Sequence, residues 1–257
     1  MDLITPIVEK LKRRSRNKRS NIFNRHFKIS PQSRILDLGS EDGSHIAMLL
    51  KNTTATPSNV YIADLFEASV KAGQKKYGFT PVVIKELQQL PFEDNFFDIV
   101  FCNSAIEHVT IPKEEIWQVK SGKEFKTRSW SNQQKFAEEI RRVSRSGYFV
   151  QTPYKWFPIT SHIWLPLVGW FPRSVLIAIM HLTNKIWIKK TIPDWYLMNK
   201  KDLQMLFPDA KIITEKFAGF AKSIVAMRNR NGDHKSDTVP EVVFGKVGES
   251  EISMFRV

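Results

Sequence analysis

Residues 35–43 read ILDLGSEDG, and this stretch decides the fold. A short apolar run ends at Gly39, Gly43 closes the stretch, and apolar residues then recur at helical spacing from Ile46. This order predicts a strand, a glycine-bearing turn and a helix. Glycine lets a ligand approach the backbone, and the first turn of a helix offers free N–H groups. The spacing G-x-G-x-x-G of dinucleotide-binding proteins is absent, so a dinucleotide site is not predicted.

An acidic residue follows the second predicted strand. This strand spans residues 60–63, and Asp64 stands at its end. A carboxylate at this place can accept hydrogen bonds from both hydroxyls of a ribose. The glycine turn and Asp64 together therefore predict a cofactor of the adenosine type.

Strands and helices alternate through most of the chain. The predicted strands span residues 35–38, 60–63, 81–84, 97–102, 148–150, 211–214 and 223–227. Helices are predicted over about 131–145, ending at Gly147, and over 200–206. Alternation favours parallel pairing, whereas the short turn before the last strand favours an antiparallel pair. The sequence predicts a Rossmann-like, doubly wound α/β fold with a mostly parallel seven-stranded sheet, an antiparallel C-terminal strand and an apolar insertion.

The composition is that of a globular protein, with 42% hydrophobic and 25% charged residues among 257. Cys102 is the single cysteine, which excludes an internal disulfide and a multi-cysteine metal site, and no metal is predicted. The N-terminus lacks the apolar core of a secretory signal. A cytoplasmic location is expected, and association with a membrane stays an open alternative.

The charge is strongly basic. The net charge is +13 at pH 7, which favours anionic partners. Lys and Arg are dense in residues 1–34, and a basic amphipathic helix is predicted over 4–28, interrupted near Ser20–Asn21. This helix can cap the fold, dock on an anionic membrane or an acidic substrate, or act as a nuclear-import or RNA-binding arm. Residues 111–130 are expected to form a polar loop.

The most apolar part of the chain is the insertion at residues 154–190. It is long enough for a lid over an acceptor pocket, and it also suits packing within the domain or a monotopic membrane contact. Proline and arginine interrupt it, so a membrane span is not expected. The predicted organisation is a basic helical segment over 1–29, a domain over 30–228 that includes the insertion, and a flexible polar tail over 229–257.

Three segments resemble, in the same order, the motifs of the class I S-adenosylmethionine-dependent methyltransferases, particularly their small-molecule group. Residues 37–43 (DLGSEDG) are similar to D-L-G-C-G-T-G. Residues 86–98 (ELQQLPFEDNFFD) are similar to D-A-x-x-L-P-F-x-D-x-S-F-D. Residues 101–109 (FCNSAIEHV) resemble S-N-x-x-x-H-H/E-H-V. The resemblance implies an enzyme that uses S-adenosylmethionine.

The resemblance implies a set of cofactor-binding residues: Asp37, Gly39, Ser40, Gly43, Asp64, Leu65, Glu86, Leu87, Asn103 and Ser104. By this resemblance Asp37 orients the methionine amino group, directly or through water, and Asp64 holds the ribose. The two glycines form the floor beneath the methionine part.

The remaining implied roles concern the adenine and the acceptor. Glu86 faces the adenine amine and Leu87 packs beside the ring, while Asn103 and Ser104 lie along the methionine part and the mouth of the acceptor site. Glu41 stands where the family has its middle glycine. Its side chain would crowd the cofactor unless the loop directs it outward.

A sulfonium methyl group is already activated, so the protein has to align the acceptor and exclude water. An acceptor that must lose a proton also needs a base. His108, after the fourth strand, and His162, in the insertion, are the candidate bases, because histidine titrates near neutrality. Glu107 is a weaker candidate.

The predicted function is direct, in-line methyl transfer to a small-molecule or lipid-like acceptor, which can be anionic. One alternative is an RNA methyltransferase, although residues 103–106 lack the Asn/Asp-Pro-Pro-Tyr/Phe motif of many base-methylating enzymes. Another is a non-catalytic, cofactor-binding protein associated with a membrane.

Overall fold

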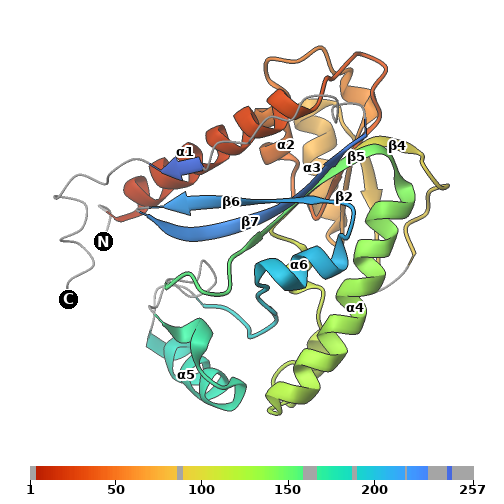
Figure 1. The fold of residues 1–257 in the computed structure, drawn as a ribbon. Coiled ribbons are helices and arrows are strands. Elements are labelled where there is room, and N and C mark those ends of the chain that lie inside the picture. Colours follow the sequence, from red (N-terminus) through yellow and green to blue (C-terminus); the bar gives the residue numbers. More distant parts are fainter. Residues whose placement is uncertain are drawn as a thin grey trace. The chain divides into compact units, whose positions relative to one another are not determined.

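The computed structural model describes residues 4–85, 89–158, 167–186, 190–217, 219–230 and 242–244. Its strands form one sheet in the order β3-β2-β1-β4-β5-β7-β6-β8 (Figure 1). The strands are β1 (Ile35–Leu38), β2 (Val60–Asp64), β3 (Thr80–Val83), β4 (Phe97–Asn103), β5 (Ser144–Pro153), β6 (Lys211–Phe217), β7 (Phe220–Asn229) and β8 (Val242–Phe244). The α-helices are α1 (Ile4–His26), α2 (Ser44–Leu50), α3 (Glu67–Tyr77), α4 (Gly122–Val143), α5 (Arg173–Ile186) and α6 (Lys200–Leu206). Short 3-10 helices are η1 (Pro57–Asn59), η2 (Ile106–His108), η3 (Lys113–Glu115) and η4 (Val168–Trp170).

The chain folds into two compact units and passes between them several times. The first unit comprises residues 1–105, 138–150 and 228–236, and the second comprises residues 106–137, 151–227 and 237–257. Strands β5 and β7 each contribute residues to both units. The domain boundaries expected near residues 29 and 228 stay a prediction.

In the first unit, β1 is the central strand. It pairs in parallel with β2 and β4, and Leu38 is in register with Ala63 and Cys102. Strand β3 continues the parallel order beside β2. The carboxyl ends of these strands therefore meet at one edge, which brings Gly39, Asp64 and Asn103 to the same end of the sheet.

Helix α1 is continuous, so the predicted interruption near Ser20–Asn21 is wrong. The hydroxyl of Ser20 donates to the carbonyl of Arg16 (3.0 Å), four residues earlier, which keeps this polar residue within the helix. Phe23 is fully buried, with its ring centroid 5.7 Å from those of Phe101 and Phe149. Helix α1 also packs against α2 (Figure 1). Burial of this face against the sheet outweighs the local polarity.

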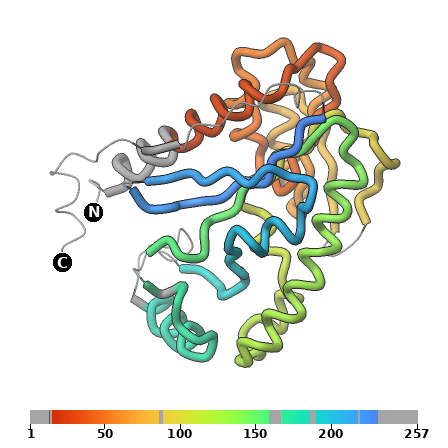
Figure 2. Tube along the Cα trace, viewed as in Figure 1, coloured from red at the N-terminus to blue at the C-terminus, as the bar shows by residue number. Residues whose placement is uncertain are grey.

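In the second unit, β6 and β7 form the predicted antiparallel pair, with Lys211 opposite Met227 (Figure 2). Strand β8 pairs in parallel with β6. The predicted helix at 200–206 is confirmed as α6. Its capping box joins the Asn199 side chain to the N–H of Asp202 (3.0 Å) and the Asp202 side chain to the N–H of Asn199 (2.9 Å).

A buried arginine anchors the described part of the insertion. The Arg173 guanidinium donates to the carbonyls of Ile116 and Val119 (2.7 Å each) and of Pro193 (2.9 Å). Helix α5 follows Arg173, and its residues Leu176 and Met180 pack in a core cluster with Trp117, Trp195 and Leu197. Arg173 thus fixes the start of α5 to the rest of the second unit.

Helix α4 begins at Gly122, so the loop expected over 111–130 is wrong from that residue onward. Ser129 and Gln133 are fully buried on the same helical face as Phe125. These polar residues at core positions hide the apolar period of the helix. Gly147 does not end the helix either. It lies within β5, where a Cβ would overlap the carbonyl of Arg228.

The predicted Rossmann-like α/β fold, mostly parallel and with antiparallel strands toward the C-terminus, is confirmed. Strand β8 is an addition that the polar, weakly patterned tail did not predict. Within the described ranges, every helix is too short or too polar to cross a membrane.

Candidate active site

The turn after β1 needs glycine at two positions. Gly39 has φ +75° and donates its N–H to the carbonyl of Ala63 (2.8 Å). A Cβ at Gly39 would overlap the side chain of Ala105. Gly43 has φ +71°, and a Cβ there would lie 2.9 Å from Cγ2 of Ile62. A side chain at either position would push this turn away from the sheet.

Asp64 holds the turn in place. Its Oδ2 accepts the N–H of Glu41 (2.8 Å), and its Oδ1 accepts the N–H of Phe66 (3.2 Å). Carboxylate oxygens have more than one lone pair, so Asp64 retains acceptor capacity for ribose hydroxyls. Glu41 has φ +51° and is exposed. The side chain of Glu41 therefore lies at the surface of the turn, and its crowding of the cofactor stays a prediction.

The carboxyl group of Asp37 is unusual because it is almost fully buried in the first unit. It is 2% exposed, and its Oδ2 has no hydrogen-bond partner within the described part of the chain. Burial, together with the charges of Asp64, Glu41 and Asp42, raises the pKa of the Asp37 carboxyl well above its usual range. A cation that donates hydrogen bonds would satisfy the buried oxygen and offset the mutual repulsion. The amino group of S-adenosylmethionine is such a donor, so these residues fit the cofactor.

Other predicted cofactor residues lie around this turn or at the end of β4. Ser40 is buried, and its carbonyl accepts the N–H of Gly43 (2.9 Å). Leu65 is half-buried next to Asp64. Ser104 is exposed, with φ +55°, immediately after Asn103. Glu86 and Leu87 lie outside the described residues.

Helix α1 reaches the end of β4 through Arg19. The Arg19 Nη1 donates to Oδ1 of Asn103 (2.7 Å), and Arg19 is 7% exposed. Arg19 was not predicted as a site residue, because in the sequence it resembles the many other basic residues of α1. Its spacing of four residues from Phe23 was the signal that it lies on the buried face.

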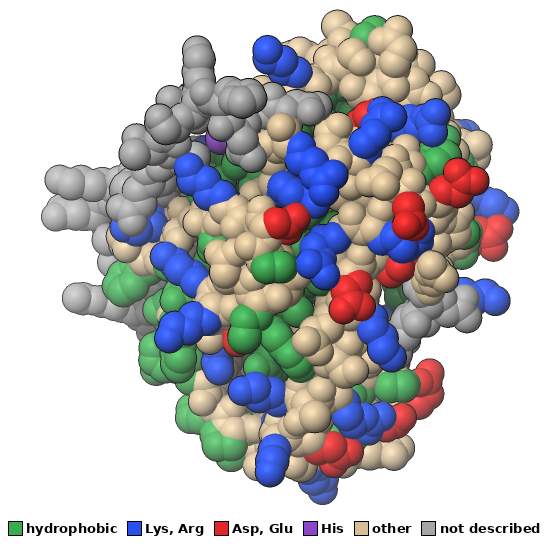
Figure 3. Space-filling model, turned by 45° about the vertical axis from the view of Figure 1, so that its right-hand side comes forward, with side chains coloured by type: hydrophobic (Ala, Val, Ile, Leu, Met, Phe, Trp, Pro, Cys, Tyr) green, Lys and Arg blue, Asp and Glu red, His purple; other side chains and the backbone are tan. Residues whose placement is uncertain are grey.

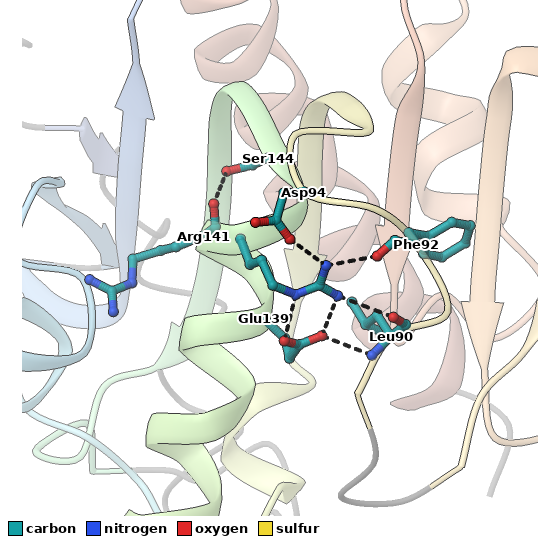
Figure 4. A network of polar contacts seen from close by, with 7 residues as sticks. Leu90, Phe92, Asp94, Glu139, Arg141 and Ser144 are labelled. Atoms are coloured by element: carbon teal, nitrogen blue, oxygen red, sulfur yellow. Dashed lines mark hydrogen bonds and ion pairs between the residues drawn. The ribbon is translucent and has the colours of Figure 1, made fainter.

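Arg142, at the end of α4, holds the segment 90–94. Figure 4 labels its partners Leu90, Phe92, Asp94 and Glu139. The guanidinium donates to the carbonyls of Phe92 (2.7 Å) and Leu90 (3.1 Å) and to Asp94 (2.9 Å). Glu139 aligns Arg142 (2.7 Å) and accepts the N–H of Leu90 (2.8 Å). These contacts fix the part of the second motif that follows the undescribed residues 86–88.

In the second unit, His108 pairs with an acid that is remote in sequence. Its Nδ1 lies 3.1 Å from Oδ1 of Asp194, and its side chain is 40% exposed. Thr110 donates its hydroxyl to the carbonyl of Asp194 (3.0 Å), which helps to hold the acid in place. Neighbouring Glu107 is fully buried, and its Oε2 accepts the hydroxyl of Thr152 (3.0 Å). The second candidate base, His162, lies outside the described residues.

The surroundings of His108 favour its protonated form. Partial burial lowers the pKa of His108, but the hydrogen bond to Asp194 and the charges of Glu107 and Asp194 outweigh burial and the repulsion from Lys113. The pKa of His108 is therefore raised above its ordinary value. Burial likewise raises the pKa of Glu107 against the opposing effects of His108 and Thr152. The carboxylate of Asp194 thus orients the His108 ring and favours its cationic form.

Residues 36–150 match the family model described as a methyltransferase domain. Residues 36–150 form a methyltransferase domain, as the predicted S-adenosylmethionine-dependent family implies. The predicted family, enzyme class and cofactor are confirmed. The individual roles of the site residues in this domain stay predictions. Among the residues that can be described, no three His, Cys, Asp or Glu side chains gather as metal ligands.

Solved structures resemble the methyltransferase domain in fold. A possible exported protein from Bordetella parapertussis is 8% identical, with a TM-score of 0.54 over 85% of this chain and 68% of that chain. The magnesium protoporphyrin IX methyltransferase of Synechocystis with bound SAH is 14% identical, with a TM-score of 0.49 over 89% of each chain. A SAM-dependent methyltransferase from Aquifex aeolicus is 15% identical, with a TM-score of 0.44 over 81% of this chain and 88% of that chain. The comparison with curated proteins found no match.

We expect Asp64→Ala to weaken binding of S-adenosylhomocysteine at least tenfold, or about 1.4 kcal/mol. The substitution removes a ribose acceptor and releases the N–H of Glu41. Isothermal titration measures the change. Glu41→Gln is the matched control, because it removes a charge from the same loop but keeps the backbone contact, and it should bind normally. An unchanged affinity of Asp64→Ala would remove Asp64 from the cofactor site.

Proposed function

We propose that this methyltransferase acts on a small or amphipathic acceptor that must lose a proton, with His108 as its base and Asp194 as the residue that positions His108. The observation that carries the proposal is the contact between Nδ1 of His108 and Oδ1 of Asp194 (3.1 Å). A carboxylate on Nδ1 favours the tautomer that keeps the proton there and leaves the basic lone pair on Nε2.

The cofactor, when bound, supplies a sulfonium-activated methyl group. The residues of this chain have to hold it, orient the acceptor and remove one proton. Asp37 binds the cofactor's amino group, and Asp64 with the glycine turn holds its nucleoside part. His108 takes the proton from the acceptor's hydroxyl or ammonium group at Nε2, and Asp194 stabilises the imidazolium that forms.

Apolar surroundings in the second unit support a small or amphipathic acceptor. Close to His108 in the chain, Ile111, Ile116, Val119 and Phe125 form a buried cluster, with Tyr196 packed against it. Arg173 lies over the ring of Phe125 in this cluster, 3.4 Å from its centroid, but its guanidinium already donates to the carbonyls of Ile116 and Val119.

The acceptor class is tested with methyl-labelled S-adenosylmethionine and fractions of a cell extract. We expect label in the organic-soluble, small-molecule fraction. Label confined to RNA, or label that is not transferred to any fraction, would contradict the proposal.

The role of Asp194 is tested by the pH profile of the rate. The rate should rise with pH as His108 loses its proton, with a midpoint above the ordinary histidine pKa. Asp194→Asn removes the hydrogen bond and charge that favour protonated His108, so the midpoint should move to lower pH and the plateau kcat should fall. Lys113→Gln removes a repelling cation and should move the midpoint the other way. An unmoved midpoint in Asp194→Asn would exclude Asp194 as the positioning residue.

A further inference from the structure

The second unit exposes a group of large apolar side chains, which we call the aromatic patch: Trp156, Leu167, Trp170, Phe171, Val175 and Leu182. Each of these side chains is between 42% and 61% exposed. Single exposed apolar residues need no explanation, but a group of this size marks a surface that contacts a partner or a membrane.

Contacts between residues 154–158 and residues 167–186 bring side chains of the patch together. The N–H of Leu167 donates to the carbonyl of Pro158 (2.6 Å). The ring centroids of Trp156 and Trp170 lie 6.3 Å apart, edge to face. Phe171 directly follows, and two residues later α5 begins. Val175 and Leu182 are seven residues apart and share one face of that helix.

The opposite face of α5 packs into the core of the second unit. Leu176 and Met180 lie in the core cluster with Trp195 and Leu197, and Arg173 ties the first turn to Ile116, Val119 and Pro193. Val175 and Leu182 therefore lie on the outer face of an anchored helix, and the patch is not part of the core of its unit.

The formal charges within the insertion have one sign. No aspartate or glutamate occurs between Glu139 and Asp194, a range that includes the whole insertion. Lys155 lies over the ring of Trp156, 5.2 Å from its centroid. Lys185 and Lys190 are exposed at the far end of α5, where mutual hydrogen bonds of Asn184 and Thr191 (2.8 and 3.0 Å) return the chain to the helix.

Basic and apolar side chains also mix in the space-filling view, where blue Lys and Arg surround green apolar groups toward the lower left (Figure 3). Tryptophan and phenylalanine settle at the boundary between lipid headgroups and acyl chains, and lysines beside them bind anionic headgroups. A protein partner would need acidic groups to match these lysines, whereas an anionic bilayer supplies both the negative charge and the apolar layer.

We propose that the aromatic patch docks this protein on the surface of an anionic lipid bilayer, with the rings in the headgroup region and Lys155, Lys185 and Lys190 on the phosphates. The contact is peripheral, since no described helix can cross the bilayer. This surface is independent of the methyl-transfer proposal, because docking requires neither cofactor nor acceptor.

The test is co-sedimentation of the full chain with vesicles of phosphatidylcholine alone or of phosphatidylcholine mixed with phosphatidylglycerol, whose anionic headgroups create a negative surface potential. We expect binding to the anionic vesicles and little to the neutral ones. Phe171→Ser with Leu182→Ser should weaken this binding about tenfold or more. Met205→Ser with Phe220→Ser is the matched control, since these side chains lie outside the patch and are 63% and 61% exposed, and it should bind as the unmodified chain does.

A second pair of variants distinguishes attraction by the lysines near the patch from attraction by the net charge of the whole protein. Each lysine near an anionic surface contributes about fivefold to binding, so Lys185→Glu with Lys190→Glu should weaken it at least about 25-fold. Lys51→Glu with Lys75→Glu makes the same change of net charge on exposed residues of the first unit and should have a much smaller effect.

If the Lys185→Glu, Lys190→Glu variant and the Lys51→Glu, Lys75→Glu variant lost vesicle binding equally, the proposal would be overturned, because only the net charge would then matter. Full binding by the Phe171→Ser and Leu182→Ser variant would overturn it too. For the unmodified chain, anionic vesicles with brominated acyl chains should quench tryptophan fluorescence. Absence of quenching would also overturn docking through the patch, even if a variant failed to fold.

Discussion

His108→Ala should lower kcat by about 10²–10⁴-fold, the usual contribution of a positioned general base. Nδ1 of His108 lies 3.1 Å from Asp194, so alanine removes both the proton acceptor and the cation that Asp194 would stabilise. Asp37 and Asp64, which we predict to bind the cofactor, belong to the other unit, which keeps its hydrogen bonds. Affinity for S-adenosylhomocysteine should therefore stay unchanged.

The measurement is single-turnover methyl transfer together with isothermal titration of the cofactor product. His181→Ala is the matched control, because His181 is exposed on α5 and rests against the Trp117 ring (4.5 Å between centroids). We expect it to keep the rate of the unmodified enzyme. A His108→Ala enzyme with normal kcat would show that the acceptor needs no base from this residue.

Asp37→Asn should weaken binding of S-adenosylhomocysteine about 100-fold, close to 3 kcal/mol, because a hydrogen bond to a buried charge is lost. The same substitution should stabilise the protein without cofactor. Burial raises the pKa of Asp37 in the folded state, so ionising it costs more there than in the unfolded chain. This cost appears as pH rises above the ordinary carboxyl pKa and is complete above the folded one. An amide has no charge to bury, so it avoids that cost.

Thermal unfolding at pH 8, with and without S-adenosylhomocysteine, measures both effects. The asparagine variant should have the higher Tm without ligand and little further rise with it. Glu67→Gln removes a charge from the exposed surface of the same unit and should change neither value. A Tm for Asp37→Asn that still rises fully with ligand would show that Asp37 does not hold the cofactor.

Local pattern was enough to predict the centre of the fold. The apolar run before Gly39 and the acid after the second strand can be recognised from a few neighbouring residues. The structure places Gly39, Asp64 and Asn103 at one edge because parallel strands in register end together. The interruption in α1 and the late start of α4 were wrong for a shared reason. Buried polar residues, Ser20 in one helix and Ser129 in the other, look like surface residues in a sequence.

Partners that are distant in sequence could not be predicted. Asp194 meets His108 with a sequence separation of 86, and Arg19 meets Asn103 with a separation of 84. Arg142 reaches segment 90–94 from the end of a helix. A charged side chain carries no local sign of the group that it will contact, since that contact depends on how the strands and helices pack.

The sequence by itself determined that a glycine turn with acids at strand ends would bind an adenosyl cofactor, because strand period, turn chemistry and charge type are properties of neighbouring residues. Only the tertiary structure decided that Glu41 is exposed, that a buried oxygen of Asp37 has no partner among the described residues, and that α5 has an exposed apolar face. Burial and pairing arise when remote segments exclude water together, and that is a property of the packed chain.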